Sequence, residues 1–370
     1  MSVHVQPVTG RRDLADFVGL PYPLHRGDPC WVAPLRRDVR ARLSRARNPF
    51  FDHAEAEYFL ARSRDRVAGR IAAIHNRLHD EVHGDRVGFF GFFECARDPE
   101  VAAALFEAAA GWLRARGLAV LRGPASFSTN DEAGLLVDGF DTPPTVMMPH
   151  NPPWYAGLVE GAGLRKAKDL LVYRRAADPL PARLVEAAAV LERRHGITVR
   201  PLDRRRFEAE VGLVRRLYNA AWERNWGFVP MTDREIAHLA TQLRPIVVPE
   251  LVVFAEREGR PVGFGAAVPD LNVALRRNPS GRLFPGILKV WWAARRIDRL
   301  RVLLLGTLPE WRGKGLDMLL YKGIWEAARG KGYRWAEAGW VLEDNHAMRN
   351  GLERMGFERY KTYRLYDRAL

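Results

Sequence analysis

The sequence has few of the features that mark secreted, membrane-spanning or metal-binding proteins. Cys30 and Cys95 are its only cysteines, too few and too far apart for a disulfide framework or a thiolate metal site. The first residues carry no secretory signal, and no apolar run approaches the ~20 residues that span a bilayer. We therefore expect a protein of a reducing compartment, either free in the cytoplasm or in peripheral contact with the inner face of the membrane.

Lysine is also scarce, with 7 lysines beside 51 arginines. The formal net charge of +14 would ordinarily suggest nucleic acid or an anionic membrane as a partner. The skew toward arginine is instead typical of a genome-wide codon bias, and no basic tail, zinc-finger spacing or RNA-binding string accompanies the charge. We therefore expect no nucleic-acid partner, and an acidic ligand or an anionic bilayer would explain the same surplus.

The common nucleotide-binding and metal-binding signatures are missing as well. The chain has no G-x-x-x-x-G-K-[ST] phosphate loop, and a G-x-G-x-x-G fingerprint fails because Met318 stands at the third glycine position. His75, His79 and His83 are spaced four apart, as metal ligands on a helix would be. Neighbouring Asn, Asp and Gly residues favour an irregular connection there, so we expect no metal site.

The 370 residues suffice for two average domains, and the chain contains an internal repeat. RVAGRIAAI at residues 66–74 matches RPVGFGAAV at 260–268, and Asn151 with GLVEGAGL behind it matches Asn345 with GLERMGF. Both pairs are offset by 194 residues, although the pieces between them require compensating insertions. We expect an α/β protein with a mixed sheet, made of two copies of one fold at residues 1–177 and 178–370.

Hydrophobic patterning predicts alternating strands and helices in both copies. A stretch rich in Trp, Leu and Arg at residues 283–300 is either an amphipathic helix packed on a sheet, the simpler interpretation, or an interfacial helix against a bilayer. In the first copy we expect a hairpin of strands 57–60 and 71–74 around a turn at 65–69, a strand at 87–94, a helix at 99–116, a strand at 118–121 and an ordered loop at 123–150. In the second copy we expect helices at 180–194 and 207–222 and strands at 197–201, 251–256, 262–268, 301–308 and 334–341.

One turn in the second copy has the properties of an anion site. The apolar strand at residues 301–308 runs into Arg312-Gly313-Lys314-Gly315, and a helix with Leu316 on its apolar face follows. Backbone N–H groups at such a turn and the positive end of the helix can bind phosphates, and glycine permits close approach and positive φ. For two glycines alone, a purely structural turn is the simpler interpretation.

The string RGKGLD after a strand, followed by Asn345 and LERMGF, resembles the GNAT acyltransferase superfamily. The acyl-CoA motif of that superfamily is Q/R-x-x-G-x-G/A, which Arg312 and Gly315 match. Asp317 stands where the family has Gly or Ala, and Leu352 stands where many members place a tyrosine that protonates the departing thiolate. Longer strings across residues 5–365, such as NDEAGLLVDGFDTPP, YNAAWERNWGFVP and AGWVLEDN, are similar to the bacterial ceramide synthase-like branch.

This resemblance implies tandem GNAT-like folds and an N-acyltransferase. The expected co-substrate is acyl-CoA, with no permanently bound cofactor, and the expected acceptor is the amine of a sphingoid base or another amino lipid. Backbone N–H groups at the end of the strand would stabilise the oxyanion, with Gly306 permitting an irregularity there. The implied acyl-CoA contacts are Leu305, Gly306, Thr307, Arg312, Gly313, Lys314, Gly315, Leu316 and Asn345, the last of which we also expect to cap a helix.

Two acidic residues near the end of the strand at 334–341 are candidates for the base that accepts the amine proton. They are Glu343, for which surface solvation is the alternative, and Glu337, while Asp270 is a weaker candidate. Four polar or aromatic residues are expected to face the substrate, although an ordered interdomain surface would have the same composition: Asn225, Trp226, Asn130 and Glu132.

The first copy lacks the phosphate turn, because the acidic string CARDPE follows its corresponding strand. One acyl-CoA per chain is therefore expected, bound by the second copy. Two alternatives stay open: an aminoacyl-tRNA-dependent ligase of the tandem GNAT type, and a non-catalytic acyl-CoA or lipid-binding module. The sequence leaves the oligomeric state open.

Overall fold

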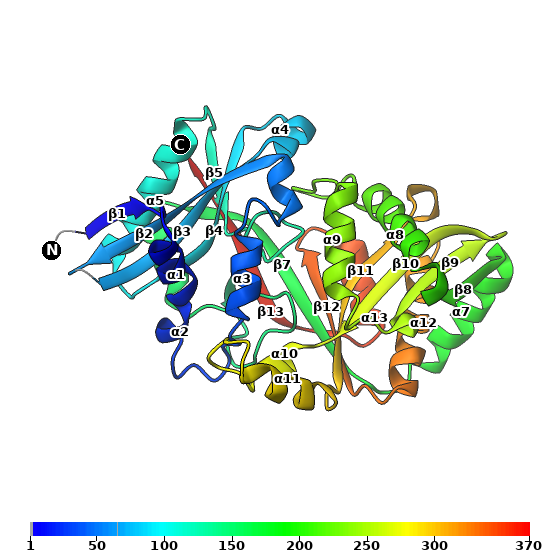
Figure 1. The fold of residues 1–370 in the computed structure, drawn as a ribbon. Coiled ribbons are helices and arrows are strands. Elements are labelled where there is room, and N and C mark those ends of the chain that lie inside the picture. The colour runs from blue at the N-terminus through cyan, green and yellow to red at the C-terminus, as the bar shows by residue number, and fades with distance from the viewer. Residues whose placement is uncertain (1–2, 65) are drawn as a thin grey trace. The chain divides into compact units, whose positions relative to one another are not determined.

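The computed structural model describes residues 3–64 and 66–370, so Asp65 of the expected turn lies outside the described residues. The chain divides into two compact units. The first comprises Met1–Leu170, Ala274–Ala293 and Lys361–Leu370, and the second comprises Leu171–Val273 and Ala294–Tyr360. Figure 1 labels their elements, which include strands and helices in both units.

The chain contains strand hairpins, such as β2 with β3 and β9 with β10, as well as strands separated by helices. Up to the end of the first long segment they are β1 (Val3–Pro7), α1 (Arg11–Gly19), α2 (Pro21–Leu24), α3 (Arg36–Arg42), the 3-10 helix η1 (Pro49–Asp52), β2 (Ala54–Ser63), β3 (Arg66–Asn76), α4 (Arg77–His83), β4 (Val87–Cys95), α5 (Pro99–Arg114), β5 (Val120–Gly123), β6 (Leu135–Asp138), α6 (Tyr155–Gly161) and β7 (Arg165–Ala176). The later elements are α7 (Ala182–His195), β8 (Ile197–Pro201), η2 (Arg204–Arg206), α8 (Phe207–Trp222), α9 (Asp233–Leu243), η3 (Pro249–Leu251), β9 (Val252–Arg257), β10 (Arg260–Pro269), α10 (Asn272–Leu275), α11 (Gly286–Ala294), β11 (Arg299–Thr307), η4 (Pro309–Trp311), α12 (Leu316–Gly330), β12 (Trp335–Leu342), α13 (His346–Arg354) and β13 (Glu358–Ala369).

The first unit is built on a sheet in the strand order β1-β2-β3-β4-β5-β13, in which β4 and β5 run parallel. Helix α5 packs on this sheet through one face, which buries residues such as Leu105 and Leu113. Glycines in the strands let the helix approach closely. A Cβ on Gly69 would lie 2.6 Å from Leu105, and a Cβ on Gly88 would collide with Leu113.

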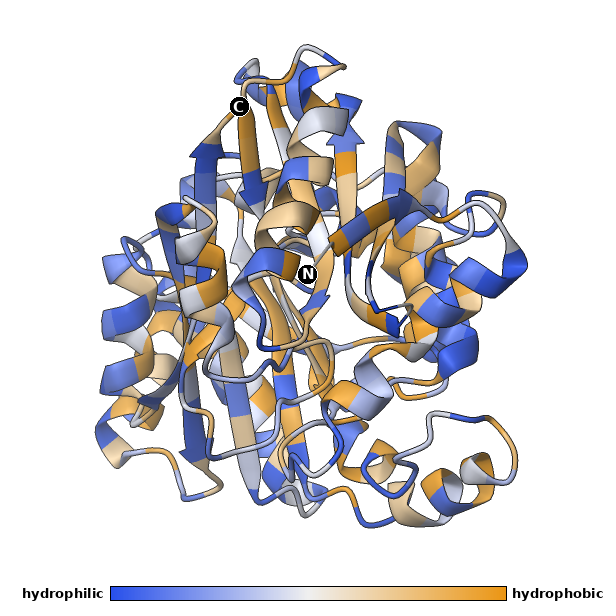
Figure 2. Cartoon of the chain, turned by 90° about the vertical axis from the view of Figure 1, so that its left-hand side faces the viewer, coloured by the Kyte–Doolittle hydropathy of each residue, from blue (hydrophilic) through white to orange (hydrophobic). Residues whose placement is uncertain are grey.

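The second unit has a sheet in the order β7-β12-β11-β10-β9-β8, in which β11 and β12 run parallel. Residues of α7 and α12 share one apolar core with β11 and β12, and residues of α8 share another core with β9 and β10. Hydrophilic and hydrophobic residues occur along the same helices and strands in Figure 2, as amphipathic elements require.

The last strand of each sequence repeat continues into the unit of the other repeat. The end of β13 pairs with β5 and β6 in the first unit, from Tyr366 opposite Gly123 to Ala369 opposite Val120. The end of β7 lies beside β12 in the second unit. The sequence predicted two consecutive copies with a boundary between residues 177 and 178. The observed units differ, because each contains chain segments from both sides of this boundary. A local pattern does not show which sheet a strand joins.

The repeat itself is visible in the strands. β3 begins at Arg66 and β10 at Arg260, an offset of 194 residues, and β7 begins at Arg165 and β13 at Glu358. The predicted strand at 197–201 and helix at 207–222 have the predicted bounds. The sequence missed β1, β7 and β13, and the loop at 123–150 contains the short strand β6. No helix in residues 3–64 and 66–370 has both the length and the apolar character needed to cross a bilayer.

Candidate functional site

The two parallel strands of the second unit separate part-way along their length. Their pairing covers four residue pairs and ends at Val302 and Ala338. Both strands continue beyond this point, β11 to Thr307 and β12 to Leu342. Along this stretch β11 and β12 are not paired with each other, although β11 stays paired with β10 as far as Thr307. A ligand with polar groups can bind the backbone between the two strands.

An extra residue in β11 lies where the separation begins. The register of β10 against β11 skips Leu303, which sits between Val302 and Leu304. Such a bulge bends a strand and increases its local twist. The bulge directly follows Val302, the last residue of β11 that pairs with β12.

Gly306 serves close packing and does not form the bulge, which corrects the role we expected for it. A Cβ at this position would lie 2.5 Å from a ring carbon of Trp222 and 2.7 Å from the Cβ of Ala221. Both residues lie at the end of α8. The glycine therefore lets the end of α8 approach the end of β11.

The turn after β11 holds its two glycines in the left-handed conformation, which the absence of a side chain permits. The φ angles are 71° at Gly313 and 79° at Gly315, and residues with a Cβ rarely adopt such values. A Cβ on Gly313 would meet no atom within 4 Å, whereas one on Gly315 would lie 2.6 Å from Leu191 in α7. One glycine thus faces open space and the other packs against the protein.

The basic side chains of the turn have different partners. Arg312 donates a hydrogen bond from Nη2 to the carbonyl oxygen of Ala221, at 2.9 Å. The ammonium of Lys314 lies 4.6 Å from the ring centre of Trp311. Both basic residues are exposed, so their charge adds to the positive end of α12.

Helix α12 begins without a capping side chain. Gly315 is its N-cap, and no side chain in the described part of the chain caps its first N–H groups. These groups have no intrahelical partners. The helix at the corresponding place in the first unit, α5, is capped by Asp98, which accepts from the N–H groups of Glu100 and Val101. The start of α12 can therefore bind an external anion, whereas a carboxylate of the chain already occupies the start of α5.

The two departures from the GNAT pattern have structural explanations. The Oδ2 atom of Asp317 lies 3.6 Å from the position that a Cβ on Gly351 would take, so this carboxylate is directed toward α13. Leu352 is fully buried in the core that contains α12. Burial, and to a smaller extent the charge of Asp317, raises the pKa of Tyr321 above its usual range, which keeps this phenol protonated.

Glu337 is buried in the paired part of the two strands. Its Oε1 atom lies 3.6 Å from Nε of Arg301, and Oε2 accepts a hydrogen bond from the hydroxyl of Tyr360. Arg301 also donates to the carbonyl of Gly339, at 3.1 Å. Arg301 and Tyr360 therefore hold the carboxylate of Glu337 in place. Removing Arg301 would leave the buried charge of Glu337 uncompensated. The sequence did not single them out, although charges inside apolar strands, such as Arg301, can indicate a buried pair.

Glu343 and Asn345 lie just beyond the end of β12, where the two strands have separated. Glu343 is partly exposed, and its backbone carbonyl accepts a hydrogen bond from Arg349 at 2.7 Å. Asn345 caps α13, because its side chain accepts from the N–H of Met348 at 3.1 Å. The expected capping by Asn345 is confirmed. Glu343 lies at the end of β12, beyond the part that pairs with β11. Asp270, by contrast, is buried and accepts from the N–H of Asn272.

The residues predicted to face the substrate lie in loops of both units. Asn225 and Trp226 are half-buried in the turn that leaves α8 in the second unit. Asn130 and Glu132 lie in the first unit, where Glu132 forms an ion pair with Arg42 at 3.1 Å. A role in substrate binding stays a prediction for all four.

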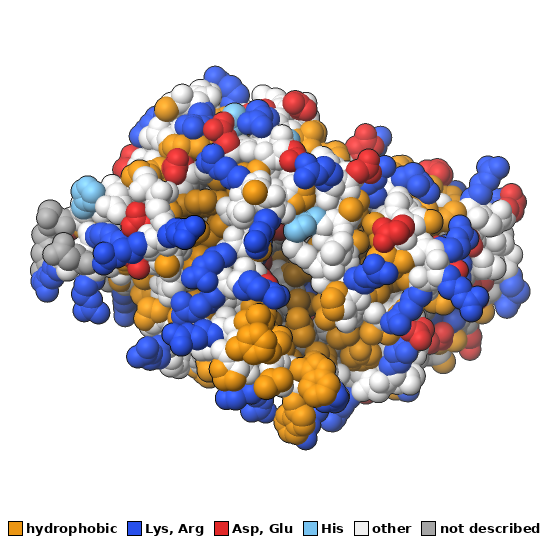
Figure 3. Space-filling model, in the orientation of Figure 1, with side chains coloured by type: hydrophobic (Ala, Val, Ile, Leu, Met, Phe, Trp, Pro, Cys, Tyr) orange, Lys and Arg blue, Asp and Glu red, His pale blue; other side chains and the backbone are white. Residues whose placement is uncertain are grey.

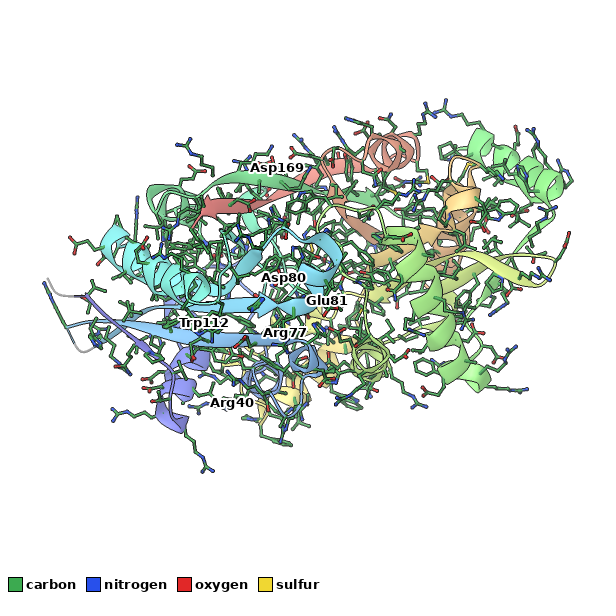
Figure 4. The ribbon with its side chains drawn as sticks, turned by 90° about the horizontal axis from the view of Figure 1, so that it is seen from above. Arg40, Arg77, Asp80, Glu81, Trp112 and Asp169 are labelled. Atoms are coloured by element: carbon green, nitrogen blue, oxygen red, sulfur yellow. The ribbon has the colours of Figure 1, made fainter. Side chains whose placement is uncertain are left out.

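The three spaced histidines take part in hydrogen bonds and ring contacts. His75 bonds to Asp80 at 2.6 Å and His79 to Asp85 at 3.0 Å. His79 and His83 lie on α4, which corrects the irregular connection we expected, and Figure 4 labels Asp80 on this helix. Among the residues that the structure describes, no group of three or more His, Cys, Asp or Glu side chains could hold a metal ion.

Comparison with known proteins decides the family. The family model described as Acetyltransferase (GNAT) family matches residues 213–357. The chain is 37% identical to the bacterial ceramide synthase of Caulobacter vibrioides (strain NA1000 / CB15N), over 100% of this chain and 98% of that protein. The chain belongs to the GNAT acyltransferase family. This GNAT enzyme is also 36% identical to protein YghO of Escherichia coli (strain K12), over 99% of its own length and 95% of that protein.

Solved structures share the fold of this GNAT protein. A tandem GNAT protein from the clavulanic acid biosynthesis pathway superposes with a TM-score of 0.58 at 14% identity, covering 100% of this chain and 98% of that chain. A GCN5-related N-acetyltransferase from Sphaerobacter thermophilus has a TM-score of 0.56 at 15% identity, covering 99% and 95%. The predicted tandem GNAT fold is confirmed. The region matched by the family model contains the separated strands and the turn at Gly313 and Gly315.

Proposed function

We propose that this GNAT N-acyltransferase transfers an acyl chain from acyl-CoA to the amine of an amino lipid such as a sphingoid base. The observation that carries the proposal is the separation of β11 from β12 beyond Val302, which continues into the uncapped start of α12. The diverging strands offer backbone groups to an extended ligand, and the helix start offers N–H groups to its phosphates. The name of the relative from Caulobacter vibrioides, bacterial ceramide synthase, supports a sphingoid acceptor.

The turn fits the phosphates of a coenzyme A thioester that acts as co-substrate, with no permanently bound cofactor. Open space at the position of a Cβ on Gly313 lets a phosphate approach the backbone closely. The first N–H groups of α12, at Leu316 and its neighbours, are not capped by a side chain of the described residues and can bind a phosphate. The positive charges of Arg312 and Lys314 attract the negative phosphates. Asn345, which caps α13, is proposed as a further contact at the open end of the strands.

The proposed reaction is direct attack of a neutral amine on the thioester carbonyl. A C–N bond forms and the carbonyl oxygen becomes an oxyanion. Backbone N–H groups at residues 305–307 are proposed to stabilise it, because these residues lie beyond the last pair that β11 forms with β12. The C–S bond then breaks, leaving the amide and the CoA thiolate. The proton released by the amine passes to a base and returns, directly or through water, to the thiolate.

Glu343 is the proposed base. It follows the end of β12 at the open side of the strands, it is partly exposed, and its backbone is anchored by Arg349. Glu337 is the second candidate, but its carboxylate is occupied by Arg301 and Tyr360 in the paired part of the strands. Asn225 and Trp226, in the turn after α8, are proposed to contact the acceptor.

Mass spectrometry of the purified protein tests the proposed reaction. The protein is incubated with acyl-CoAs from acetyl to palmitoyl and with candidate amines that include a sphingoid base, and free CoA and amide are followed. Amide formation with long-chain thioesters and the sphingoid base supports the proposal. Consumption of acetyl-CoA alone would make the protein an ordinary acetyltransferase. CoA binding without turnover would favour a binding module, and transfer only from aminoacyl-tRNA would favour a ligase.

Paired substitutions test the choice of base. Glu343→Gln is expected to lower kcat by roughly 100-fold, because the amide cannot accept the amine proton. Glu258→Gln is the control, because Glu258 is 81% exposed in the turn between β9 and β10. A loss in Glu337→Gln with full activity in Glu343→Gln would assign the role to Glu337, provided that the variant keeps its melting temperature. Full activity in both variants would reject both bases.

A further inference from the structure

Helix α11 carries apolar residues on two opposite sides. Gly286, Val290 and Ala293 are buried in the first unit. On the other side, four large apolar residues are exposed and define an apolar patch. They are Phe284, which precedes the helix and is 71% exposed, Leu288 at 65%, Trp291 at 61% and Trp292 at 55%.

Packing of α11 on the protein explains the buried side only. Leu288, Trp291 and Trp292 are spaced by three and four residues, so they share one side of the helix. They and Phe284 are the four most exposed of the large apolar residues in the described part of the chain. A helix that only packs on the protein core would carry polar residues at these positions. The simpler interpretation of residues 283–300, an amphipathic helix packed on a sheet, therefore does not explain the exposed side of α11.

The residues around the patch are basic. From Arg276 to Arg296 the sequence contains no Asp or Glu, whereas it contains six basic residues, Arg276, Arg277, Arg282, Lys289, Arg295 and Arg296, all of them exposed. Figure 3 shows the exposed apolar side chains gathered over α11 at the lower edge of the view, with Lys and Arg side chains beside them.

A second basic element lies against the same segment. The N–H of Arg36, at the start of α3, donates to the carbonyl of Gly281 at 2.9 Å, and its Nε donates to the carbonyl of Ser280 at 3.0 Å. Arg37 and Arg40 of α3 are exposed, and Figure 4 labels Arg40 on this helix. Their charge adds to that of residues 276–296 in the same unit.

The segment before α11 has a defined shape. Asn278 is 3% exposed, donates to the carbonyl of Arg282 at 2.8 Å and accepts from Ser280 at 2.9 Å. The Tyr22 hydroxyl and ring pack so closely at Gly281 that a Cβ there would collide with them. The exposed apolar side chains are therefore presented by an anchored segment.

We propose that the apolar patch and its basic surroundings form a surface that inserts into an anionic lipid bilayer. Tryptophan and leucine on one side of a helix, a phenylalanine just before it, and arginine and lysine around them match the chemistry of interfacial helices. The apolar side chains bury in the acyl boundary, and the basic residues attract anionic headgroups. An anionic bilayer is a better partner for this patch than a groove on another protein, because the apolar side chains are exposed and the charges around them are all positive. This inference does not depend on the proposed acyl transfer.

Vesicle flotation with the full chain tests the membrane surface. Vesicles of phosphatidylcholine with phosphatidylglycerol are compared with vesicles of phosphatidylcholine alone. The protein is expected to float with the anionic vesicles, less strongly at high salt, and the double variant W291S/W292S is expected to lower the partition coefficient by about tenfold or more. Trp154→Ser is the control, because Trp154 is an exposed tryptophan outside the patch, at 39%.

Further outcomes separate the membrane from other occupants. Absence of wild-type flotation would overturn the proposal, and so would flotation that W291S/W292S leaves unchanged. A concentration-dependent dimer in sedimentation velocity that W291S/W292S abolishes, without vesicle binding, would show that a second copy covers the patch. Charge reversal in R282E/K289E is expected to weaken binding to anionic vesicles, and unchanged binding would remove the role of the basic residues. Matching melting temperatures exclude misfolding, because the changed side chains are exposed.

Discussion

At the scale of single residues, Gly313 and Gly315 are subject to different constraints although they belong to one turn. Both have positive φ angles, but only Gly315 has a neighbouring side chain where a Cβ would stand. Gly313 borders open space, which is what a ligand that approaches the backbone requires. The sequence alone does not show that Gly313 borders open space while Gly315 packs against a side chain.

We predict that Gly315→Ala destabilises the protein by about 2–4 kcal/mol, because the change adds backbone strain and a clash with Leu191. Gly313→Ala should cost only about 1–2 kcal/mol of strain but weaken CoA binding, since its methyl would fill the open space. Gly330→Ala at the end of α12 is the control, because a Cβ there meets no atom within 4 Å. Chemical denaturation and calorimetric CoA titration measure both effects. Equal losses of stability at Gly313 and Gly315 would contradict the packing argument.

Asp169 links β7 to β13 within the first unit, and Figure 4 labels it. It accepts two hydrogen bonds from Arg364, at 2.7 and 3.0 Å. Burial alone would raise the pKa of Asp169, but the hydrogen bonds from Arg364 and Lys166 outweigh it and hold the pKa below its usual value. The stabilisation is therefore present above the unfolded-state pKa and is lost as the pH falls through the folded-state pKa.

Asp169→Asn is expected to lower the free energy of unfolding by about 1–3 kcal/mol at neutral pH. The difference from the wild type should shrink as the pH falls from about 5 to about 2, because protonation removes the same charge from the wild type. Urea unfolding of both proteins across this range measures it. A difference that stays constant with pH would show that the pair contributes no charge-dependent stability.

At the scale of elements, the ends of β11, α8 and α12 together form the candidate acyl-CoA site. The bulge at Leu303 turns the strand, Gly306 lets α8 approach it, and Arg312 bonds to the last turn of α8. The comparison of α12 with α5 explains why only one copy is expected to bind the co-substrate. Asp98 supplies to α5 the negative group that α12 leaves to a ligand.

Gly306→Ala is expected to lower stability by about 1–3 kcal/mol, because the new methyl overpacks the contact with Trp222. Acyl transfer should fall more than stability predicts, since the end of α8 and the end of β11 would move apart. Gly212→Ala, in the middle of α8, is the matched control and should stabilise by about 0.5–1 kcal/mol through helix propensity. Denaturation and steady-state rates of both variants decide this, and full activity in Gly306→Ala would show that the contact does not shape the site.

At the scale of the whole molecule, the exchanged strands make each unit depend on both sequence repeats. The first unit receives the end of β13, where Lys361 donates to the carbonyls of Gly139 and Thr142, and Tyr363 donates to that of Pro149. Without this strand, β5 has an unpaired edge, which exposes backbone groups and promotes aggregation.

Fragments 1–177 and 178–370 are therefore expected to be insoluble or unfolded when each is expressed alone, because each lacks part of the sheet of its own unit. Co-expression should restore soluble, associated protein, since both missing strands are then supplied. Circular dichroism and analytical gel filtration measure folding and association. A cooperative melt of fragment 1–177 by itself would contradict the dependence on β13.

The sequence by itself determined the local features: the helix at 207–222, the strand at 197–201, the glycine turn, the cap at Asn345 and the existence of a repeat. These follow from periodicity, capping and permitted φ angles, which depend on residues close in the chain. The exchange of β7 and β13, the separation of β11 from β12, the pairing of Glu337 with Arg301 and the exposure of α11 were decided only by the tertiary structure. Each depends on which distant segments pack together, because the same amphipathic pattern can be covered by the protein or left to a partner.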